Sequence, residues 1–288
     1  MPDKRPSNRY RLLALDIDGT VLNSAQQVTP ELKAALARLA RDGVRTVLCT
    51  GRRWGNTAHV LREIEHAHPV VVCAGGAMIK EANPERTLYK NLLDLEVACH
   101  AAEVFRDGGL VPIFLFDKPL GERDMWIAEA DRPQAETFVY FRSNAASFGF
   151  FPGGCPVVGE GPLEVFTMDR ERRVRPAVEL VRKGVGKAAR VDAMSQPRFG
   201  VDQLALEVHA PTATKWNALQ WLLGKWGIDA AEVIAIGDDV NDIPLLRAAG
   251  LSFAMGNASD EVKAAARAVT SSNDEHGVVE ALQSVFGA

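Results

Sequence analysis

The residues of this chain most suited to chemistry are two aspartates spaced two positions apart. Asp16 and Asp18 come directly after 12–15, an apolar run that predicts a strand buried on both faces of a sheet. Open α/β sheets place their reactive groups beyond the carboxyl ends of such strands. An ordinary strand followed by an Asp-Gly turn would also explain this segment. The polar residues that follow the other predicted elements decide between the two interpretations.

Three later segments bring polar groups to the same edge of the predicted sheet. The first follows a strand over 44–49, the second begins a helix shortly after 211, and the third follows a strand over 233–236. Their polar groups are those of Thr50, Gly51, Lys215, Asp238, Asn241 and Asp242. Because the carboxyl ends of parallel strands share one edge, these groups can converge on Asp16 and Asp18.

Several carboxylates gathered at one place need a cation to stay ionised. Each close pair repels by about 4 kcal/mol at an effective dielectric constant of about 20. Oxygen ligands without histidine or cysteine favour Mg²⁺, which takes one or two carboxylates together with phosphate oxygen and water. Thr50, the N–H of Gly51 and Lys215 would then form the opposite side of the site, where they can bind phosphate.

This constellation resembles the haloacid dehalogenase-like superfamily of aspartyl-phosphate hydrolases, and the likeness covers nearly the whole chain. The matching residues are those of 16–20 (Asp-Ile-Asp-Gly-Thr), 50–52 (Thr-Gly-Arg), Lys215 and 237–242 (Gly-Asp-Asp-Val-Asn-Asp). The long insertion between the second and third motifs is similar to that of the type II branch, the Cof-like phosphatases with a C2B cap. Residues 255–258 and 274–278 also resemble the C-terminal signature of that branch.

The resemblance implies catalytic and metal-binding roles for the acidic residues. Asp16 would attack phosphorus and form an aspartyl-phosphate. Asp18 would protonate the leaving group and then deprotonate the water that hydrolyses the intermediate. Asp16, the main-chain carbonyl of Asp18 and Asp238 would bind Mg²⁺, with Asp242 as a direct or supporting ligand. An acid two residues after the nucleophile goes with the phosphatases and phosphomutases of this superfamily.

The resemblance also implies a set of phosphate-binding residues. Thr50, the N–H of Gly51 and Asn241 would hold the phosphoryl oxygens, and Lys215 would offset their negative charge. Arg52 is a further candidate for substrate contact, although capping of the sheet edge explains this residue equally well.

Two segments depart from the pattern of the superfamily. Residues 75–77 read Gly-Gly-Ala where the superfamily usually has Asn-Gly-Ala, and Lys215 is flanked by Thr214 and Trp216 instead of glycines. Neither change removes a catalytic group. Both alter the wall of the expected pocket, which weakens any analogy with the substrates of relatives.

The predicted elements give an α/β fold with a doubly wound parallel sheet, the Rossmann-like core of the haloacid dehalogenases, and an inserted α+β cap domain. Strands alternate with single helices over 1–83 and again over 211–288, which we assign to the catalytic core. Residues 84–210 change this rhythm and would form the cap. Within it we expect strands at 110–116, 164–168 and 203–208, a helix over 175–182, and a substrate-facing loop at 148–156, where Pro and Gly are frequent.

The function that follows is a Mg²⁺-dependent phosphatase acting on a small soluble phosphomonoester, such as a sugar phosphate or a phosphorylated cofactor. A phosphomutase with the same phospho-aspartate chemistry is the alternative among enzymes. A non-enzymatic phospho-acceptor or binding domain, built like a response-regulator receiver, is a further alternative. The long insertion and Asp18 both argue against it, since receivers have neither.

Composition narrows the partners and the compartment. The 288 residues are 47% hydrophobic and 24% charged with a net charge of −4, which gives no general field for nucleic acid or an anionic membrane. Cys49, Cys73, Cys99 and Cys155 form no Cys-x-x-Cys pair and do not look like a disulfide framework. The N-terminal residues lack the apolar region of a secretory signal. We therefore expect a reducing compartment, the cytoplasm, and leave the oligomeric state open.

Overall fold

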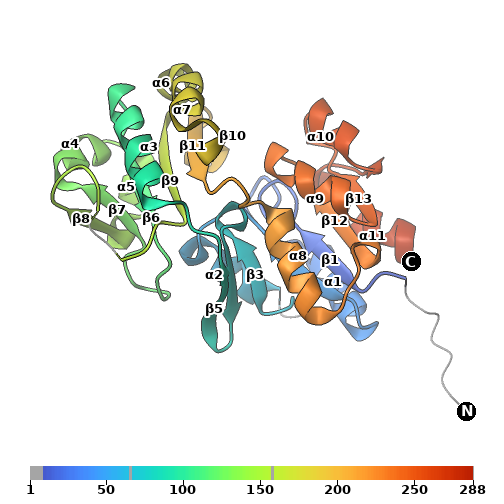
Figure 1. Cartoon of the computed structure of the whole chain (residues 1–288). Helices are drawn as coiled ribbons and strands as arrows, with labels where there is room; N and C mark the ends of the chain where they lie inside the picture. The colour runs from blue at the N-terminus through green and yellow to red at the C-terminus, as the bar shows by residue number, and fades with distance from the viewer. Residues whose placement is uncertain (1–8, 65–66, 157–158, 288) are drawn as a thin grey trace, which may run out of the picture. The chain divides into compact units, whose positions relative to one another are not determined.

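The computed structural model describes residues 9–64, 67–156 and 159–287. The chain divides into two compact units, Met1–Leu88 with Thr214–Ala288, and Tyr89–Ala213 (Figure 1). We call the first the catalytic unit and the second the inserted unit.

The catalytic unit is built on a mixed sheet in the order β14-β13-β12-β1-β2-β3-β4-β5. Its strands are β1 (Leu12–Leu15), β2 (Arg45–Cys49), β3 (Val70–Cys73), β4 (Met78–Ala82), β5 (Glu85–Lys90), β12 (Val233–Gly237), β13 (Leu251–Ala254) and β14 (Ala268–Val269). The run from β14 to β3 is parallel, and β4 is antiparallel to β3. β1 is buried along its whole length, as its apolar sequence predicts.

β1 lies at the point where the strand order reverses. It pairs with β12 on one side (Leu12 with Val233) and with β2 on the other (Leu12 with Arg45). Because crossovers between parallel strands are right-handed, the helices that follow β1 and β2 fall on the opposite face from those that follow β12 and β13. The predicted doubly wound α/β fold is confirmed, and the crevice at such a reversal is the usual ligand site.

Threonine side chains cap two helices of the catalytic unit, α1 and α8. The helices of this unit are α1 (Pro30–Arg41), α2 (Trp54–Glu63), α8 (Lys215–Trp226), α9 (Ile243–Ala248), α10 (Asp260–Ala265) and α11 (Gly277–Phe286), with short 3₁₀ turns η1 (Ala74–Gly76), η7 (Ala230–Glu232), η8 (Val240–Asp242) and η9 (Asn273–Glu275). Thr29 accepts a hydrogen bond from the N–H of Leu32 at the start of α1, and Leu32, Leu36 and Leu39 form its buried stripe, as predicted. Thr214 caps α8 in the same way.

The alternation of strands and single helices stops near Asn83 because the chain makes a turn there, inside the catalytic unit. Only Asn83 and Pro84 separate β4 from β5, and these strands are neighbours in the sheet. Along the chain, the boundaries between the compact units therefore fall between Leu88 and Tyr89 and between Ala213 and Thr214. Each is a few residues beyond the expected boundaries at 83 and 211. The sequence signal of a turn at 83–84 is the same for a hairpin as for a domain boundary.

The inserted unit is a second mixed sheet in the order β10-β11-β9-β6-β7-β8. Its elements are β6 (Ile113–Leu115), β7 (Met125–Ala128), β8 (Phe148–Phe151), β9 (Glu164–Arg170), β10 (Arg190–Ser195), β11 (Gln203–His209), α3 (Leu95–Asp107), α4 (Arg132–Ala135), α5 (Val139–Ser143), α6 (Glu171–Val174) and α7 (Val178–Val185), with η2 (Glu129–Asp131), η3 (Ala145–Ser147), η4 (Arg175–Ala177), η5 (Gly186–Ala188) and η6 (Pro197–Phe199). A core that includes Phe105, Phe114, Val181 and Leu206 joins α3 and α7 to the sheet.

Two expectations for the inserted unit are wrong. Phe148–Phe151 is strand β8, paired with β7 (Met125 with Phe148), and not part of a loop. Its aromatic residues pack in the sheet, and the glycines that suggested a loop lie within or just after the strand. Cys99 and Cys155 form a disulfide with a Cα–Cα separation of 5.4 Å, whereas Cys49 and Cys73 are free and buried. Two cysteines 56 residues apart give no local pattern that predicts this pairing.

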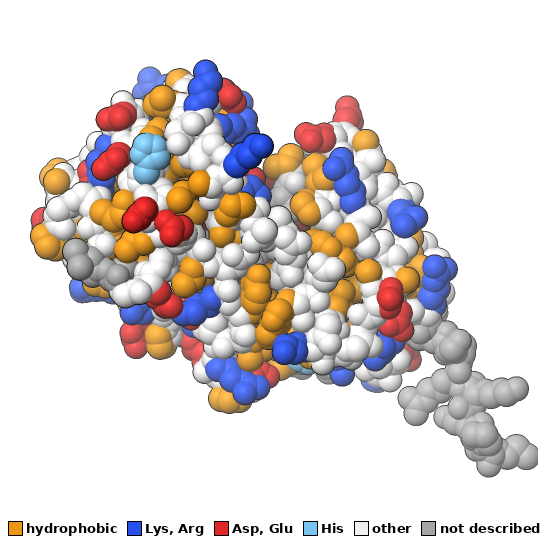
Figure 2. All heavy atoms as spheres, in the orientation of Figure 1, with side chains coloured by type: hydrophobic (Ala, Val, Ile, Leu, Met, Phe, Trp, Pro, Cys, Tyr) orange, Lys and Arg blue, Asp and Glu red, His pale blue; other side chains and the backbone are white. Residues whose placement is uncertain are grey.

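The surface agrees with the mild net charge. Acidic and basic side chains are interspersed on the face that Figure 2 draws, without a broad field of one sign. Among the described residues, no helix has the length and apolar character needed to cross a membrane.

Candidate active site

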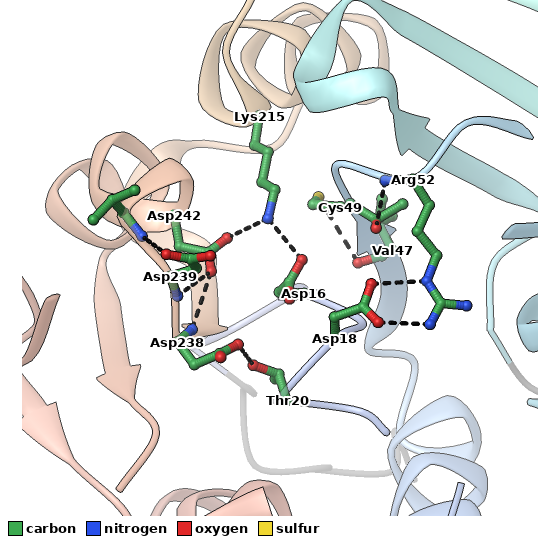
Figure 3. A network of polar contacts seen from close by, with 12 residues as sticks. Asp16, Asp18, Thr20, Val47, Cys49, Arg52, Lys215, Asp238, Asp239 and Asp242 are labelled. Atoms are coloured by element: carbon green, nitrogen blue, oxygen red, sulfur yellow. Dashed lines mark hydrogen bonds and ion pairs between the residues drawn. The ribbon is translucent and has the colours of Figure 1, made fainter. Parts of the chain in front are cut away.

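Asp16 lies at the centre of a buried group of charges beyond the end of β1 (Figure 3). The Nζ of Lys215 donates one hydrogen bond to Oδ1 of Asp16 and another to Oδ1 of Asp242, each 2.6 Å long. The three residues are at most 4% exposed. Lys215 is the first residue of α8, so the capped start of that helix aims its ammonium group at two carboxylates from different loops.

Asp242 holds the loop after β12 in place. Its Oδ2 accepts hydrogen bonds from the N–H groups of Asp238 (3.0 Å) and Asp239 (3.1 Å), while its Oδ1 accepts from Lys215. Both of its carboxylate oxygens are therefore engaged with the protein. This geometry fits a residue that positions Lys215 and Asp238 better than a direct metal ligand.

Asp238 contacts two residues of the loop after β1, Gly19 and Thr20. The hydroxyl of Thr20 donates to its Oδ1 over 2.8 Å, and Asn257 donates to its Oδ2 over 3.3 Å. Gly19 has a φ of +73°, and a Cβ there would overlap the Asp238 carboxylate. Glycine at this position thus permits both the left-handed backbone and the close approach of Asp238.

The charges of this cluster fit a divalent metal ion. Asp16, Asp238 and Asp242 present oxygens within 4.8 Å of one another, and Lys215 supplies one positive charge against three negative ones. Burial, reinforced by the neighbouring carboxylates, raises the pKa of Asp16 to about 7 and that of Asp238 to about 9. Burial opposes the charge of Lys215, but Asp16 and Asp242 outweigh it and raise its pKa. With all three carboxylates ionised, two negative charges remain to be balanced, and the donors are all oxygen, as Mg²⁺ prefers.

Asp18 is held by Arg52. The guanidinium group donates from Nε to Oδ2 (2.7 Å) and from Nη2 to Oδ1 (2.6 Å), and it also donates to Gln26 and to the main-chain carbonyl of Asn56. The Arg52 side chain is 4% exposed, whereas that of Asp18 is 41% exposed. Arg52 therefore anchors the partly open Asp18, a contact that the sequence interpretation did not anticipate.

The remaining predicted residues lie at the strand ends on either side of β1. Thr50 directly follows β2; its N–H pairs with Val72, and its hydroxyl oxygen accepts from the N–H of Arg52. Gly51 comes next, and Asn241 lies in η8 beside Asp242. These positions flank Asp16 along one edge of the parallel sheet, as the topology requires.

Thr20 and Asn257 both contact Asp238, although the sequence pattern predicts no role for either residue. Thr20 belongs to the first motif and Asn257 to the C-terminal signature, so the motifs mark both residues without indicating that they contact Asp238.

The structure also explains why the segment at 75–77 can differ from the pattern of the superfamily. Gly75 has a φ of 61°, a conformation open to both Asn and Gly, and a Cβ on Gly76 would overlap the main chain of Thr214. The backbone beside Lys215 therefore tolerates the loss of Asn.

Comparison with known proteins identifies the family. The model of the haloacid dehalogenase-like hydrolases matches residues 13–148 and 192–282. Phosphatase YwpJ of Bacillus subtilis (strain 168) is 29% identical over 297 residues, covering 95% of this chain and 99% of that protein. From the same organism, 5-amino-6-(5-phospho-D-ribitylamino)uracil phosphatase YwtE is 26% identical, covering 93% of this chain and 95% of that protein. A solved haloacid dehalogenase-like hydrolase from Bacteroides thetaiotaomicron superposes with a TM-score of 0.76 at 25% identity, covering 96% of this chain and 100% of that one.

The chain belongs to the haloacid dehalogenase-like hydrolases. It is an enzyme of their phosphatase class, a phosphoric monoester hydrolase. The resemblance to the type II, Cof-like branch that the motifs predicted is confirmed.

Proposed function

We propose that this protein is a Mg²⁺-dependent phosphatase that hydrolyses a small phosphomonoester through an aspartyl-phosphate on Asp16. The observation that carries the proposal is the buried cluster of Asp16, Asp238 and Asp242, in which the single ammonium group of Lys215 bridges Asp16 and Asp242. Such a cluster is costly to assemble unless it serves a cation and an anionic substrate.

The first half-reaction transfers the phosphoryl group to Asp16. Lys215 holds one oxygen of Asp16, and the other oxygen attacks phosphorus. As that O–P bond forms, the bond from phosphorus to the leaving oxygen breaks, and Asp18 gives its proton to the leaving group. Asp16, Asp238 and the main-chain carbonyl of Asp18 would hold Mg²⁺, which would supply positive charge against the negative charge of the carboxylate and the phosphate.

The second half-reaction returns Asp16 to its free form. Asp18 removes a proton from water, the water oxygen attacks phosphorus, and the aspartyl oxygen leaves, which releases inorganic phosphate. Thr50, the N–H of Gly51 and Asn241 bind the phosphoryl oxygens, while Lys215 offsets their charge. Asp242 positions Lys215, and Arg52 positions Asp18 rather than binding phosphate.

The inserted unit is the proposed cap that sets substrate specificity. We propose a sugar phosphate or a phosphorylated cofactor as the substrate class. Three relatives are named for 5-amino-6-(5-phospho-D-ribitylamino)uracil, whose phosphoribityl group belongs to this class, so that compound is the first candidate to test.

The test is phosphate release from a panel of phosphomonoesters, with Mg²⁺ or with a chelator. We expect activity only with the metal, and a loss of roughly a thousandfold or more in Asp16→Asn. Asp260→Asn, a change of the same kind on the exposed first turn of α10, should keep the wild-type rate. Activity that survives in Asp16→Asn would refute the mechanism.

The fate of the phosphoryl group separates hydrolysis from the mutase alternative. With ³²P-labelled substrate, Asp18→Asn should accumulate labelled protein, because water is no longer activated. A phosphomutase would instead require a bisphosphate activator and return the label to the organic product.

A further inference from the structure

A second group of side chains that could hold a metal ion lies within the inserted unit, on strands β9 and β11. Glu164, Glu207 and His209 each present a ligand atom within 4.8 Å of the other two. They are 5%, 8% and 0% exposed. Their neighbours Val165 and Val208 pack in the core with α3 and α7, so the alternation of strand side chains places the three polar residues on the other face of the sheet.

The hydrogen bond of His209 to Glu207 defines its tautomer. Its Nε2 lies 3.1 Å from Oε2 of Glu207, and since a carboxylate accepts, the proton is on Nε2. The Nδ1 atom then carries a lone pair, and it lies 3.2 Å from Oε2 of Glu164. Neither of these two atoms has a hydrogen-bond partner, although both are buried. Two acceptors so close together need a cation between them, either a proton or a metal ion.

The neighbouring charges leave room for a divalent ion. Asp192 is 4.0 Å from Nε2 of His209 and forms an ion pair with Arg190. Asp192 and Glu164 thus place two carboxylates beside His209, and Arg190 offsets the charge of Asp192. A cation at Glu164 would offset the charge of its carboxylate, which is costly to keep ionised in a buried position.

We propose that Nδ1 of His209 and the carboxylate of Glu164 bind a Zn²⁺ ion. Zinc bonds to nitrogen and oxygen of about 2.0–2.2 Å place two ligands of a tetrahedron roughly 3.3 Å apart, close to the observed 3.2 Å. The imidazole donor favours Zn²⁺ over Mg²⁺. Glu207 orients the ring through Nε2–H, the arrangement usual around zinc-bound histidines. The ion would join the first residue of β9 to the last residue of β11, which face each other in the sheet.

Zinc binding to the full chain tests this proposal. After removal of metals, saturating Mg²⁺ is added to occupy the catalytic carboxylates, and bound Zn²⁺ is counted by equilibrium dialysis. We expect one zinc ion per wild-type chain and none in Glu164→Gln or His209→Gln. Glu207→Gln should weaken binding roughly 10- to 100-fold, because a neutral amide oxygen orients the ring and raises its basicity less than a carboxylate does.

Two further variants locate the ion. His100→Gln, the same substitution at an exposed histidine of the inserted unit, should bind zinc as wild type does. Asp238→Asn should also keep the ion, which separates this site from the catalytic cluster. Zinc bound equally by Glu164→Gln and the wild type, or lost in Asp238→Asn, would overturn the proposal.

A measurement on the wild-type protein does not depend on how the variants fold. Nitrogen-15 NMR of the histidine rings should show Nδ1 of one histidine change from a free lone pair to a metal-bound nitrogen on addition of Zn²⁺, while its Nε2 remains protonated. Ring signals that do not respond to zinc would contradict the site.

Discussion

At the scale of residues, each of two buried cations of the catalytic unit binds carboxylate groups. Lys215 bridges Asp16 and Asp242, and Arg52 binds both oxygens of Asp18. The two cations differ in kind, since a lysine is a point charge and an arginine is a planar fork. Lys215 can therefore serve two carboxylates and a phosphate at once, whereas Arg52 fixes the direction of one carboxylate.

Arg52→Lys tests that difference. Lysine keeps the charge but cannot bind both oxygens of Asp18, so we expect kcat to fall about 100-fold, as for a misplaced catalytic group, with KM nearly unchanged. Steady-state kinetics on the best substrate of the panel measure both constants. Arg247→Lys, on the exposed end of α9, is the matched control and should leave both unchanged.

The split between the two constants discriminates among roles for Arg52. A residue that binds the substrate phosphate would raise KM when it is changed. A residue that only caps the sheet edge would lower the melting temperature and leave kcat near wild type. Either result would reject its proposed role on Asp18.

At the scale of elements, the start of α8 both stabilises the helix and carries Lys215 of the proposed site. The hydroxyl oxygen of Thr214 accepts a hydrogen bond of 3.1 Å from the N–H of Asn217, and Lys215 is the next residue. The N-cap therefore fixes the first turn that carries the ammonium group.

Thr214→Ala should lower the free energy of unfolding by about 1 kcal/mol, the usual effect of losing such a cap. Urea unfolding measures this loss, and the rate should fall in the same variant because Lys215 is less well positioned. Thr214→Ser should restore both. Ser259→Ala is the control, since Ser259 precedes α10 without a side-chain capping bond. Equal losses in the two alanine variants would show that the cap contributes nothing specific.

Elements with local signals were predictable from the sequence. The cap at Thr29, the stripe of α1 and the apolar run of β1 each lie within one short segment, and the structure has them as expected. The acidic cluster was also predictable, because parallel strands bring their carboxyl ends together whatever lies between them.

Contacts set by tertiary structure were not predictable. The bond from Arg52 to Asp18 depends on how two loops pack, and the Cys99–Cys155 disulfide joins distant segments. Strand β8 lacks the alternation of a half-buried strand, and β5 is partly exposed, so neither has a strong pattern. Helix α3 was not predicted from the sequence, although the side chain of Asp94 caps it through two hydrogen bonds.

At the scale of the whole molecule, the catalytic unit places several buried carboxylates on one parallel sheet, and its stability must depend on what balances them. Without metal, the pKa of Asp16 is about 7 and that of Asp238 about 9, both raised from 3.8 chiefly by burial. Between the ordinary value of 3.8 and these raised values, the folded protein holds protons that the unfolded chain has already released. Its stability therefore falls as pH rises, according to linkage.

Bound Mg²⁺ should remove this slope. A cation favours the ionised carboxylates, so folded and unfolded chains then carry the same number of protons on these groups. We expect urea unfolding in chelator to show stability falling from about pH 4 to about pH 9, most steeply below pH 7 where Asp16 and Asp238 both contribute. The stabilisation by Mg²⁺ should grow over the same range. Asp238→Asn should flatten the metal-free slope above pH 7, because no proton remains there to be released. A metal-free protein whose stability rises with pH across this window would contradict the raised pKa values and, with them, the need of this cluster for a cation.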